Sequence, residues 1–188
     1  WMLSLVFSPC IGLLKLIAQI SKELLMPIYV VGGVVRDIRM ERASLDYDLV
    51  VEGNAIDLGN SLANHFGGDV VTHNRFGTAK WKISAIKGDL AKSLSDHLGF
   101  LVAEEELPET IDLVSARREF YQHPTALPTV EHGSIKLDLH RRDFTINTLA
   151  LRLDEPFFGD LLDYWGGMAD IRAKKIRVLH SLSFIDDR

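Results

Sequence analysis

A short apolar segment that ends in two glycines constrains the fold of this chain more than any other feature. Residues 28–31 are apolar and partly β-branched, which predicts a short buried strand. Gly32 and Gly33 interrupt it, and residues 34–39 continue with helical spacing. Glycines let a backbone approach a phosphate closely, and the amides at the start of a helix attract anions. The sequence therefore predicts a strand–turn–helix unit that can hold a triphosphate.

Two aspartates, Asp46 and Asp48, follow this unit, with twelve residues between Gly33 and Asp46. They lead into the apolar residues 49–51, which predict a second strand. Because residues i and i+2 of a strand point to the same face, we expect the two carboxylates to lie side by side. Carboxylates this close repel each other unless a cation lies between them, and Mg²⁺ favours such oxygen ligands together with substrate phosphates. An isolated Asp-x-Asp is also typical of a solvated turn, but the preceding unit favours a metal site.

Three segments, in this order, resemble one family of enzymes. The Gly-Gly turn, the short helix and Asp-x-Asp resemble the signature of polymerase-β-type nucleotidyltransferases. Residues 141–150, which begin Arg-Arg-Asp-Phe-Thr, resemble the ribonucleotide-selecting motif of class II tRNA nucleotidyltransferases and bacterial poly(A) polymerases. Residues 162–171 resemble the Asp-x-x-Gly-Gly-x-x-Asp motif that links head to neck in the same family. From about residue 28 to the C-terminus, the chain therefore resembles the head domain of that family.

The resemblance implies an enzyme that transfers a nucleotide from CTP or ATP to the 3′ end of tRNA without a template and releases pyrophosphate. It implies two Mg²⁺ ions at Asp46 and Asp48, for which Mn²⁺ can substitute, in a cytoplasmic protein that binds tRNA and nucleotides. A poly(A) polymerase, which uses the same chemistry, is the first alternative. A non-catalytic module that binds nucleotides or RNA is the alternative from another class, although such a module has no reason to keep Asp46, Asp48 and Asp143.

A third carboxylate, Asp112, lies within residues 110–115, which alternate as a strand does. In polymerase-β-type enzymes an acid on a neighbouring strand helps to deprotonate the attacking hydroxyl, and the resemblance gives Asp112 this catalytic role beside Asp46 and Asp48. A general base needs to lie within hydrogen-bond reach of that hydroxyl. An aspartate on an edge strand that bonds to solvent is the alternative.

Several residues are expected to contact the nucleotide: Gly32, Gly33, Arg36, Arg142, Asp143 and Asn147. Arg36 lies one turn into the predicted helix, where it can clamp phosphates or pair with Asp37. On a second predicted helix, Asp143 and Asn147 are i and i+4 and share a face, and the resemblance implies that Asp143 selects the ribose 2′-hydroxyl. An Asp143 that caps a helix between solvated arginines is the alternative.

Basic residues that suit RNA occur in two places. Residues 117–131 begin with Arg117 and Arg118 and contain aromatics and prolines, which predicts a loop that can contact single-stranded RNA. The second cluster consists of Arg172, Lys174, Lys175 and Arg177. A solvated helix end explains that cluster as well as a contact with tRNA phosphates does.

Composition narrows the class of protein. With 188 residues, of which 47% are hydrophobic, the chain can bury a substantial core. Its net charge of −5 excludes a general polycation, so nucleic acid would have to bind local basic patches. The single cysteine, Cys10, excludes an internal disulfide and fits a reducing cytosol. The apolar residues 3–14 are too few to span a bilayer, and without a basic start they do not predict a signal peptide.

The predicted architecture is α+β, a small mixed β-sheet with helices packed on one side. Helices are expected over residues 11–25 and 54–66, and strands over residues 28–31, 49–51, 69–72, 78–83 and 110–115. Residues 87–108 give mixed signals, and a solvated face or an irregular insertion explains their run of acids, Glu104, Glu105 and Glu106.

Two regions are expected along the chain. Residues 1–155 would form the nucleotidyltransferase head domain, and residues 156–188 its end and the start of a helical neck. In the resembled family the neck carries the acid and the arginine that read the base. Residues 183–187 look like the opening of that neck, but Arg188 follows at once and ends the chain. The sequence therefore leaves open whether the enzyme adds CCA, CC, A or a poly(A) tail, and whether it forms oligomers.

Overall fold

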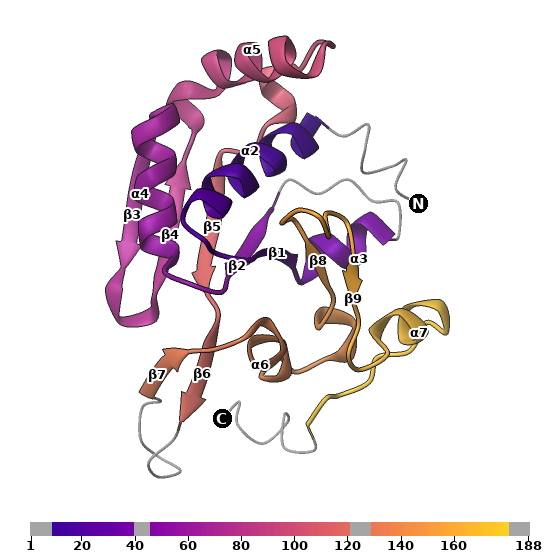
Figure 1. The fold of residues 1–188 in the computed structure, drawn as a ribbon. Coiled ribbons are helices and arrows are strands. Elements are labelled where there is room, and N and C mark those ends of the chain that lie inside the picture. Colours follow the sequence, from indigo (N-terminus) through magenta and orange to yellow (C-terminus); the bar gives the residue numbers. More distant parts are fainter. Residues whose placement is uncertain (1–8, 40–45, 121–128, 181–188) are drawn as a thin grey trace.

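Seven strands form one mixed sheet at the centre of the molecule (Figure 1). The computed structural model describes residues 9–39, 46–120 and 129–180. In their order across the sheet, the strands are β3 (Asp69–His73), β4 (Thr78–Lys82), β5 (Thr110–Ser115), β2 (Asp48–Val51), β1 (Ile28–Val31), β8 (Ala150–Arg152) and β9 (Leu161–Leu162). Strands β2 and β5 are parallel, whereas all the other neighbours are antiparallel. The segment that carries the glycines and aspartates therefore lies in the middle of the sheet.

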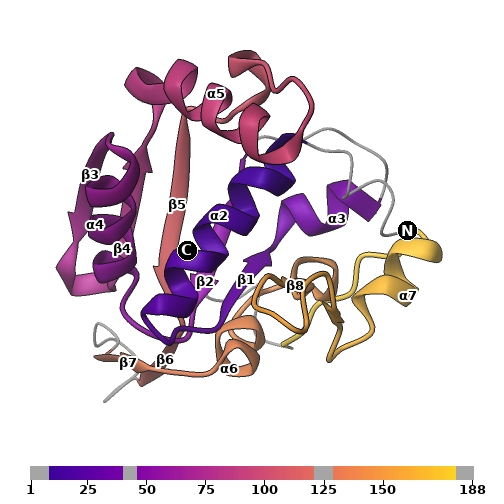
Figure 2. The same ribbon diagram turned by 45° about the horizontal axis from the view of Figure 1, so that its top comes forward.

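Three helices, α2, α4 and α5, cover one face of this sheet (Figure 2). The helices are α2 (Pro9–Glu23), α3 (Gly33–Arg39), α4 (Ala55–Phe66), α5 (Lys87–Leu98), α6 (Ile135–His140) and α7 (Gly167–Arg172). The described residues also contain four 3₁₀ turns: η1 (Asn74–Phe76), which joins β3 to β4, and η2 (Ser84–Ile86), η3 (Glu104–Glu106) and η4 (Thr145–Asn147), which lie between helices and strands. The helix over Ala55–Phe66 begins as expected, because the Asn54 side chain accepts a hydrogen bond from the backbone N–H of Ile56.

The main core lies between these helices and the sheet. Alternate strand residues such as Leu49 and Val51 are fully buried in it, whereas Val50 faces the other way. On that opposite face, α6 covers only the region around β1 and the end of β2, through Ile135 and Leu139. We call the uncovered remainder, over β3, β4, β5 and the start of β2, the open face. The expected α+β architecture with helices mainly on one side is confirmed.

The mixed signals of residues 87–108 conceal a regular helix in the first half of that segment. Lys87–Leu98 form the regular helix α5, of which only Leu90, Ala91 and Leu94 are buried. Because so few apolar residues mark its inner face, polar residues obscure the helical periodicity in the sequence. The acids of η3 are exposed, as expected for a solvated segment.

The helix expected over residues 141–150 is also absent. Ser134 caps α6 through a hydrogen bond from the backbone N–H of Leu137, so the helix starts earlier and ends at His140. A bend, η4 and strand β8 follow. The Thr148 hydroxyl donates to the backbone carbonyl of Thr145 at 2.7 Å, a local bond that competes with helix formation. Asp143 and Asn147 therefore do not share a helical face.

Two further segments refine the expectations. Residues 117–131 are not wholly a loop, because β6 (Arg117–Phe120) and β7 (Thr129–His132) pair as a separate antiparallel sheet. The tip of that hairpin and the expected neck opening at residues 183–187 lie outside the described residues. No helix in the described part of the chain combines the length and the apolar character needed to cross a membrane.

Hydrogen bonds of the Asp-x-x-Gly-Gly-x-x-Asp segment connect η4 to α7. The Asp163 carboxylate accepts hydrogen bonds from the backbone N–H groups of Gly167 (2.8 Å) and Met168 (3.0 Å) at the start of α7. One turn later, the Asp170 carboxylate accepts from the hydroxyl of Thr145, the first residue of η4, and from the Arg177 guanidinium. The motif therefore holds the turn that carries Asn147.

Gly167→Ala is expected to lower the free energy of unfolding by about 2 kcal/mol, because an added Cβ would overpack this junction. That Cβ would lie 2.4 Å from the backbone carbonyl oxygen of Thr145, which cannot move aside easily. Gly88→Ala, inside α5 with Glu104 Oε2 as its nearest contact at 3.4 Å, is the matched control and should be neutral or stabilising. Urea unfolding of both variants checks this, and equal stabilities would contradict it.

Candidate active site

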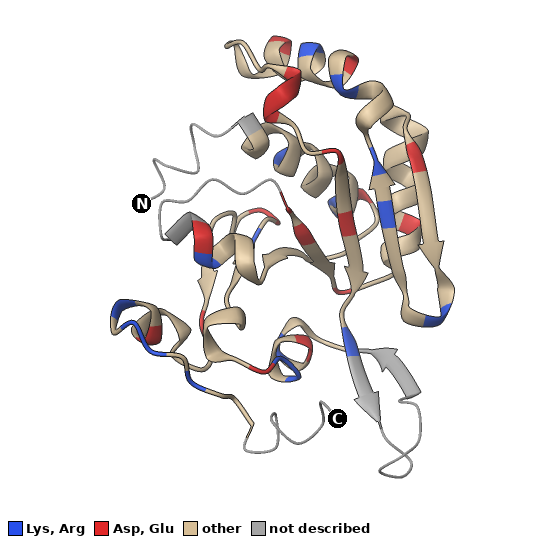
Figure 3. Cartoon of the chain, turned by 180° about the vertical axis from the view of Figure 1, so that it is seen from behind, with Lys and Arg blue, Asp and Glu red and all other residues tan. Residues whose placement is uncertain are grey.

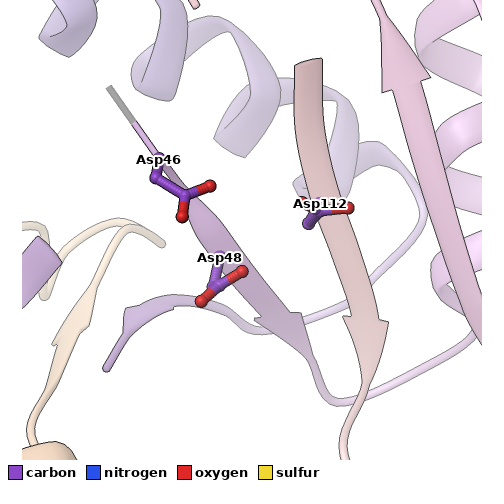
Figure 4. A group of neighbouring side chains, drawn as sticks. All are labelled: Asp46, Asp48 and Asp112. Atoms are coloured by element: carbon purple, nitrogen blue, oxygen red, sulfur yellow. The ribbon is translucent and has the colours of Figure 1, made fainter. Parts of the chain in front are cut away.

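Three aspartates meet on the open face of the sheet (Figure 4). Asp48 begins β2, Asp46 precedes it by two residues, and Asp112 lies directly opposite Asp48 in the parallel pair of β2 and β5. One oxygen from each carboxylate lies within 4.8 Å of the other two, and we call these residues the acid cluster. The expectation that the carboxylates of Asp46 and Asp48 lie close together is confirmed. Since β5 lies between β4 and β2, the alternative of an edge-strand position for Asp112 is wrong.

The acid cluster is electrostatically strained. Burial raises the pKa of Asp48 above its ordinary value, and the charges of Asp46 and Asp112 raise it further. Two cations oppose this rise: Arg142 and Lys80, whose Nζ lies 3.0 Å from Asp112 Oδ1. A raised carboxyl pKa means that the ionised cluster destabilises the folded chain near pH 7, and a bound cation would relieve that cost. Three carboxylates with no nitrogen or sulfur donor fit a hard ion such as Mg²⁺ or Mn²⁺.

The Gly32 turn lies beside the acid cluster. Gly32 has φ +75°, a left-handed conformation that favours glycine, and its N–H donates to the backbone carbonyl of Leu149 at 3.3 Å. A Cβ at Gly32 would come within 3.0 Å of Arg142 Nη1 and 3.9 Å of Asp48 Oδ2. The glycine thus lets the Arg142 guanidinium and the Asp48 carboxylate approach the same stretch of backbone.

Arg36 and Asn147 meet across the same site. The Arg36 Nε donates to Asp37 Oδ1 at 3.0 Å, so the ion pair considered as an alternative exists. Its Nη1 also donates to Asn147 Oδ1 at 3.3 Å, and its guanidinium lies against Gly33. Arg36 therefore joins α3 to η4 at the edge of the glycine turn. Its role as a phosphate clamp stays a prediction.

Arg142 is held by a residue that sequence reasoning missed, Asp138 of α6. Asp138 is fully buried, its Oδ1 accepts from Arg141 Nε at 3.3 Å, and its Oδ2 lies 3.8 Å from Arg142 Nη2. Burial lowers the pKa of Arg142, and the charge of Asp138 opposes that shift. Asp138 Oδ2 and Arg142 Nε have no hydrogen-bond partner among the described residues. The spacing of Asp138 and Arg142, four residues apart, could have indicated this pair. It has that meaning only once the helix that ends at His140 is placed correctly.

The remaining predicted site residues lie further from the acid cluster or are only partly described. Asp143 is exposed, and its backbone carbonyl accepts a hydrogen bond from the N–H of Leu179 at 2.7 Å. Its carboxylate is not part of the acid cluster. Arg117 begins β6, and its charge lowers the pKa of Arg142, so it belongs to the same electropositive region. The side chain of Arg118 lies outside the described residues.

Comparison with known proteins shows which family the chain resembles and which residues match. The model of the poly A polymerase head domain family matches residues 28–177. The A-adding tRNA nucleotidyltransferase of Geobacter sulfurreducens is 41% identical over 179 residues, which are 95% of this chain and 18% of that protein. The solved Thermotoga maritima CCA-adding enzyme complexed with tRNA-CCA is 35% identical, with a TM-score of 0.73 over 98% of this chain and 37% of that one. A tRNA nucleotidyltransferase complexed with a primer tRNA and an incoming ATP analog is 39% identical, with a TM-score of 0.69 over 91% and 41%.

The chain thus spans less than half the length of each of these three proteins. The range matched by the family model contains the glycine turn, the acid cluster, Arg142 and the Asp163–Asp170 segment. The match covers more than half of the chain and includes the site that the geometry defines. This chain belongs to the poly A polymerase head domain family.

Proposed function

We propose that this chain is the catalytic head of an RNA nucleotidyltransferase that adds nucleotides from CTP or ATP to the 3′ end of tRNA. The observation that carries the proposal is the acid cluster directly beside the Gly32 turn. The names of the compared proteins support tRNA as the acceptor. A cytoplasmic protein is part of the proposal, since that is where tRNA is available.

The acid cluster would hold the metal. Asp46 and Asp48 would supply the ligands for two Mg²⁺ ions, for which Mn²⁺ could substitute, and Asp112 lies beside them. When bound, such ions offset phosphate charge and lower the pKa of an attacking hydroxyl. Burial, and then the charges of Asp46 and Asp112, raise the pKa of Asp48, and this supports the assignment because a bound cation would favour the ionised carboxylates.

The reaction would be an in-line displacement at the α-phosphorus. The oxygen of the RNA 3′-hydroxyl bonds to that phosphorus as the bond to the β-phosphate oxygen breaks, and pyrophosphate leaves with the negative charge. Arg142, against Gly32, and Arg36, against Gly33, lie where they can neutralise that charge. Asp112, opposite Asp48, would take up the proton of the hydroxyl.

Primer extension by the complete protein tests this function. The substrates are tRNAs that end at the discriminator base, after two cytidines or after CCA, each with one nucleoside triphosphate and Mg²⁺. We expect incorporation of CMP, AMP or both at one or more of the incomplete ends. Repeated AMP addition to the CCA end would instead favour a poly(A) polymerase. Absence of transfer with every pair would contradict the proposal and favour a binding module.

Asp143→Ala is expected to reduce the preference of the complete protein for ATP over dATP, by roughly tenfold if the carboxylate accepts a bond from the 2′-hydroxyl. A site built around a hydroxyl leaves its partner unpaired with the deoxy analogue, so removing that partner removes the discrimination. Asp89→Ala, an exposed aspartate on α5, is the control. An unchanged ratio of kcat/KM for ATP and dATP in the Asp143 variant would return Asp143 to a structural role.

A polypeptide of residues 1–188 is expected to bind the Mg²⁺ complexes of ATP, CTP, GTP and UTP with little preference. The proposed head domain of residues 1–155 contacts phosphates, metal and ribose, which the four nucleotides share. Base reading would require groups of the helical neck, whose start we place within residues 156–188. Calorimetric titration with each nucleotide checks this. A preference of tenfold or more, about 1.4 kcal/mol, would show that the head itself reads the base.

A further inference from the structure

Glu52 connects the strand that carries Asp48 to the helix that leads into Arg142. It follows β2 directly, and its Oε1 accepts a hydrogen bond from the backbone N–H of Ile135, the first residue of α6, at 2.7 Å. The first N–H groups of a helix have no partner within that helix, and a carboxylate is a stronger acceptor for them than a neutral oxygen. The other cap of α6, the Ser134 hydroxyl, accepts from the backbone at 3.4 Å. Glu52 therefore makes the shorter of the two contacts that fix the start of α6.

Backbone hydrogen bonds attach the same junction to β5. The N–H of Ala116, directly after β5, donates to the carbonyl of Val51 at 2.7 Å. The N–H of Gly133 donates in turn to the carbonyl of Ala116 at 2.8 Å. Seen from behind the molecule, α6 lies next to the ends of β2 and β5 (Figure 3). The start of α6 is thus tied to the two strands that carry Asp48 and Asp112, at the ends away from these acids.

From this junction, α6 leads back to the acid cluster. Arg142, just after the helix, and Asp48 both lie close to the Gly32 turn. The path along β2 from Asp48 to Glu52 is about 13 Å long, since a strand rises about 3.3 Å per residue. The path from Ile135 to Arg142 is about 10 Å long, since a helix rises about 1.5 Å per residue. Because the two lengths are similar, fixing the start of α6 at Glu52 brings its other end back beside Asp48.

We infer that Glu52 is a positioning residue for nucleotide transfer, which holds α6 so that Arg142 stays against the Gly32 turn. The inference rests on the proposed function and adds to it a residue outside the metal and nucleotide sites. Asp138, the acid that faces Arg142, lies on α6 itself, so it orients the guanidinium but cannot fix it relative to the sheet. Glu52 follows the strand that begins with Asp48, so it can fix the arginine relative to the proposed metal ligand.

Glu52→Ala in the complete protein tests this inference against Asn54→Ala. Asn54 caps α4 by accepting from the N–H of Ile56 at 3.0 Å, so its variant also removes a contact at the start of a helix, but on the covered side of the sheet. With a tRNA that the parent extends, we expect Glu52→Ala to lower kcat/KM for the nucleotide about fivefold to tenfold, since a misplacement on the order of 1 Å can cost up to about 10²-fold. Asn54→Ala should stay within about twofold of the parent, because it acts at a separate site.

Further variants separate positioning from a purely structural role. Glu52→Gln keeps an oxygen within reach of the Ile135 N–H and should retain most of the activity, whereas Glu52→Asp keeps the charge, shortens the side chain and should lose activity. In a background of Arg142→Met, Glu52→Ala should cost less than about twofold more, because the arginine that it positions is gone. Without nucleotide, hydrogen exchange of the backbone amides of residues 135–139 should be faster in Glu52→Ala and Glu52→Asp than in Asn54→Ala.

Three results would overturn the inference. In the first, Glu52→Ala loses no more activity than Asn54→Ala does. In the second, the full loss persists in the Arg142→Met background, which would make Glu52 purely structural. In the third, hydrogen exchange in α6 is the same in the Glu52 variants as in the parent. If thermal melting shows that Glu52→Ala is unfolded, Glu52→Asp decides by the same comparisons. A parent protein that transfers no nucleotide would instead contradict the proposed function, and hydrogen exchange would still show whether Glu52 holds α6.

Discussion

Asp48→Asn is expected to lower the rate of nucleotide transfer on the order of 10³-fold or more, while the protein stays folded. Asp48 belongs to the acid cluster and lies beside the Gly32 turn, so its amide variant removes a proposed metal ligand without removing volume. Single-turnover primer extension with Mg²⁺ measures the loss. Asp46→Ala should have a similar effect, and Asp57→Asn on α4, away from the open face, is the matched control. Nucleotide transfer at the parent rate by Asp48→Asn or Asp46→Ala would contradict the proposal that these residues bind the metal.

The same variant should be at least as stable as the parent in metal-free buffer near neutral pH. The pKa of Asp48 is raised in the folded chain, so the folded state binds this proton more tightly than the unfolded state does. The folded state therefore loses stability as the pH rises from the ordinary aspartate value of about 3.9 through the raised pKa of Asp48. Asp48→Asn removes that loss. Thermal melting in EDTA at pH 4 and pH 8 checks it: the drop in melting temperature between the two should be smaller in the variant. A clearly lower melting temperature of the variant at pH 8 would contradict this account.

Arg142→Met is expected to lower kcat/KM for the nucleotide about 10²-fold, because it removes a cation held against the phosphate-binding turn. Arg142 reaches within 3.0 Å of the position of a Cβ on Gly32, and few side chains approach the turn so closely. Arg172→Met is the control, since Arg172 is an exposed arginine in the last turn of α7. Equal losses in the two variants would show that positive charge in general matters and that the position of Arg142 does not.

Asp138→Asn should then reproduce part of this loss without touching the site. Asp138 is fully buried and is the acid that faces Arg142 from α6, so its amide leaves the guanidinium less firmly oriented. We expect about a tenfold loss of kcat/KM for the nucleotide and a destabilisation of about 3 kcal/mol, since a buried charge loses its partner. In a background of Arg142→Met the kinetic loss should vanish. A kinetic loss of the same size in that background would make Asp138 purely structural.

Local patterns in the sequence were sufficient to predict the secondary structure and the paired aspartates at the centre of the molecule. The strand at residues 28–31, the glycine turn, the short helix and Asp46 with Asp48 all follow from adjacent residues, and the structure places them as expected. Asp112 was also found, because its flanking apolar residues alternate. Pairing of distant strands cannot be read from one sequence, so its position opposite Asp48 needed the structure.

The elements that were not predicted have different physical causes. Residues 141–150 were expected to be helical, yet Thr145 donates its hydroxyl to Asp170, which is distant in the sequence. The interior of α5 is marked by only three buried residues, too few for a clear period. Asp138 was missed because its contact with Arg142 depends on the fold, and the same holds for the contact of Lys80 with Asp112. Neither residue belongs to a recognised sequence motif.

Metal binding, followed alongside nucleotide transfer, tests most directly whether the acid cluster is the reaction centre. Mn²⁺ replaces Mg²⁺ and can be titrated by electron paramagnetic resonance in the presence of nucleotide, while primer extension is measured at the same metal concentrations. We expect binding and transfer to rise together, and we expect both to be lost in Asp48→Asn and in excess EDTA. Transfer that persists in EDTA, or full Mn²⁺ binding by the Asp48 variant, would contradict the assignment.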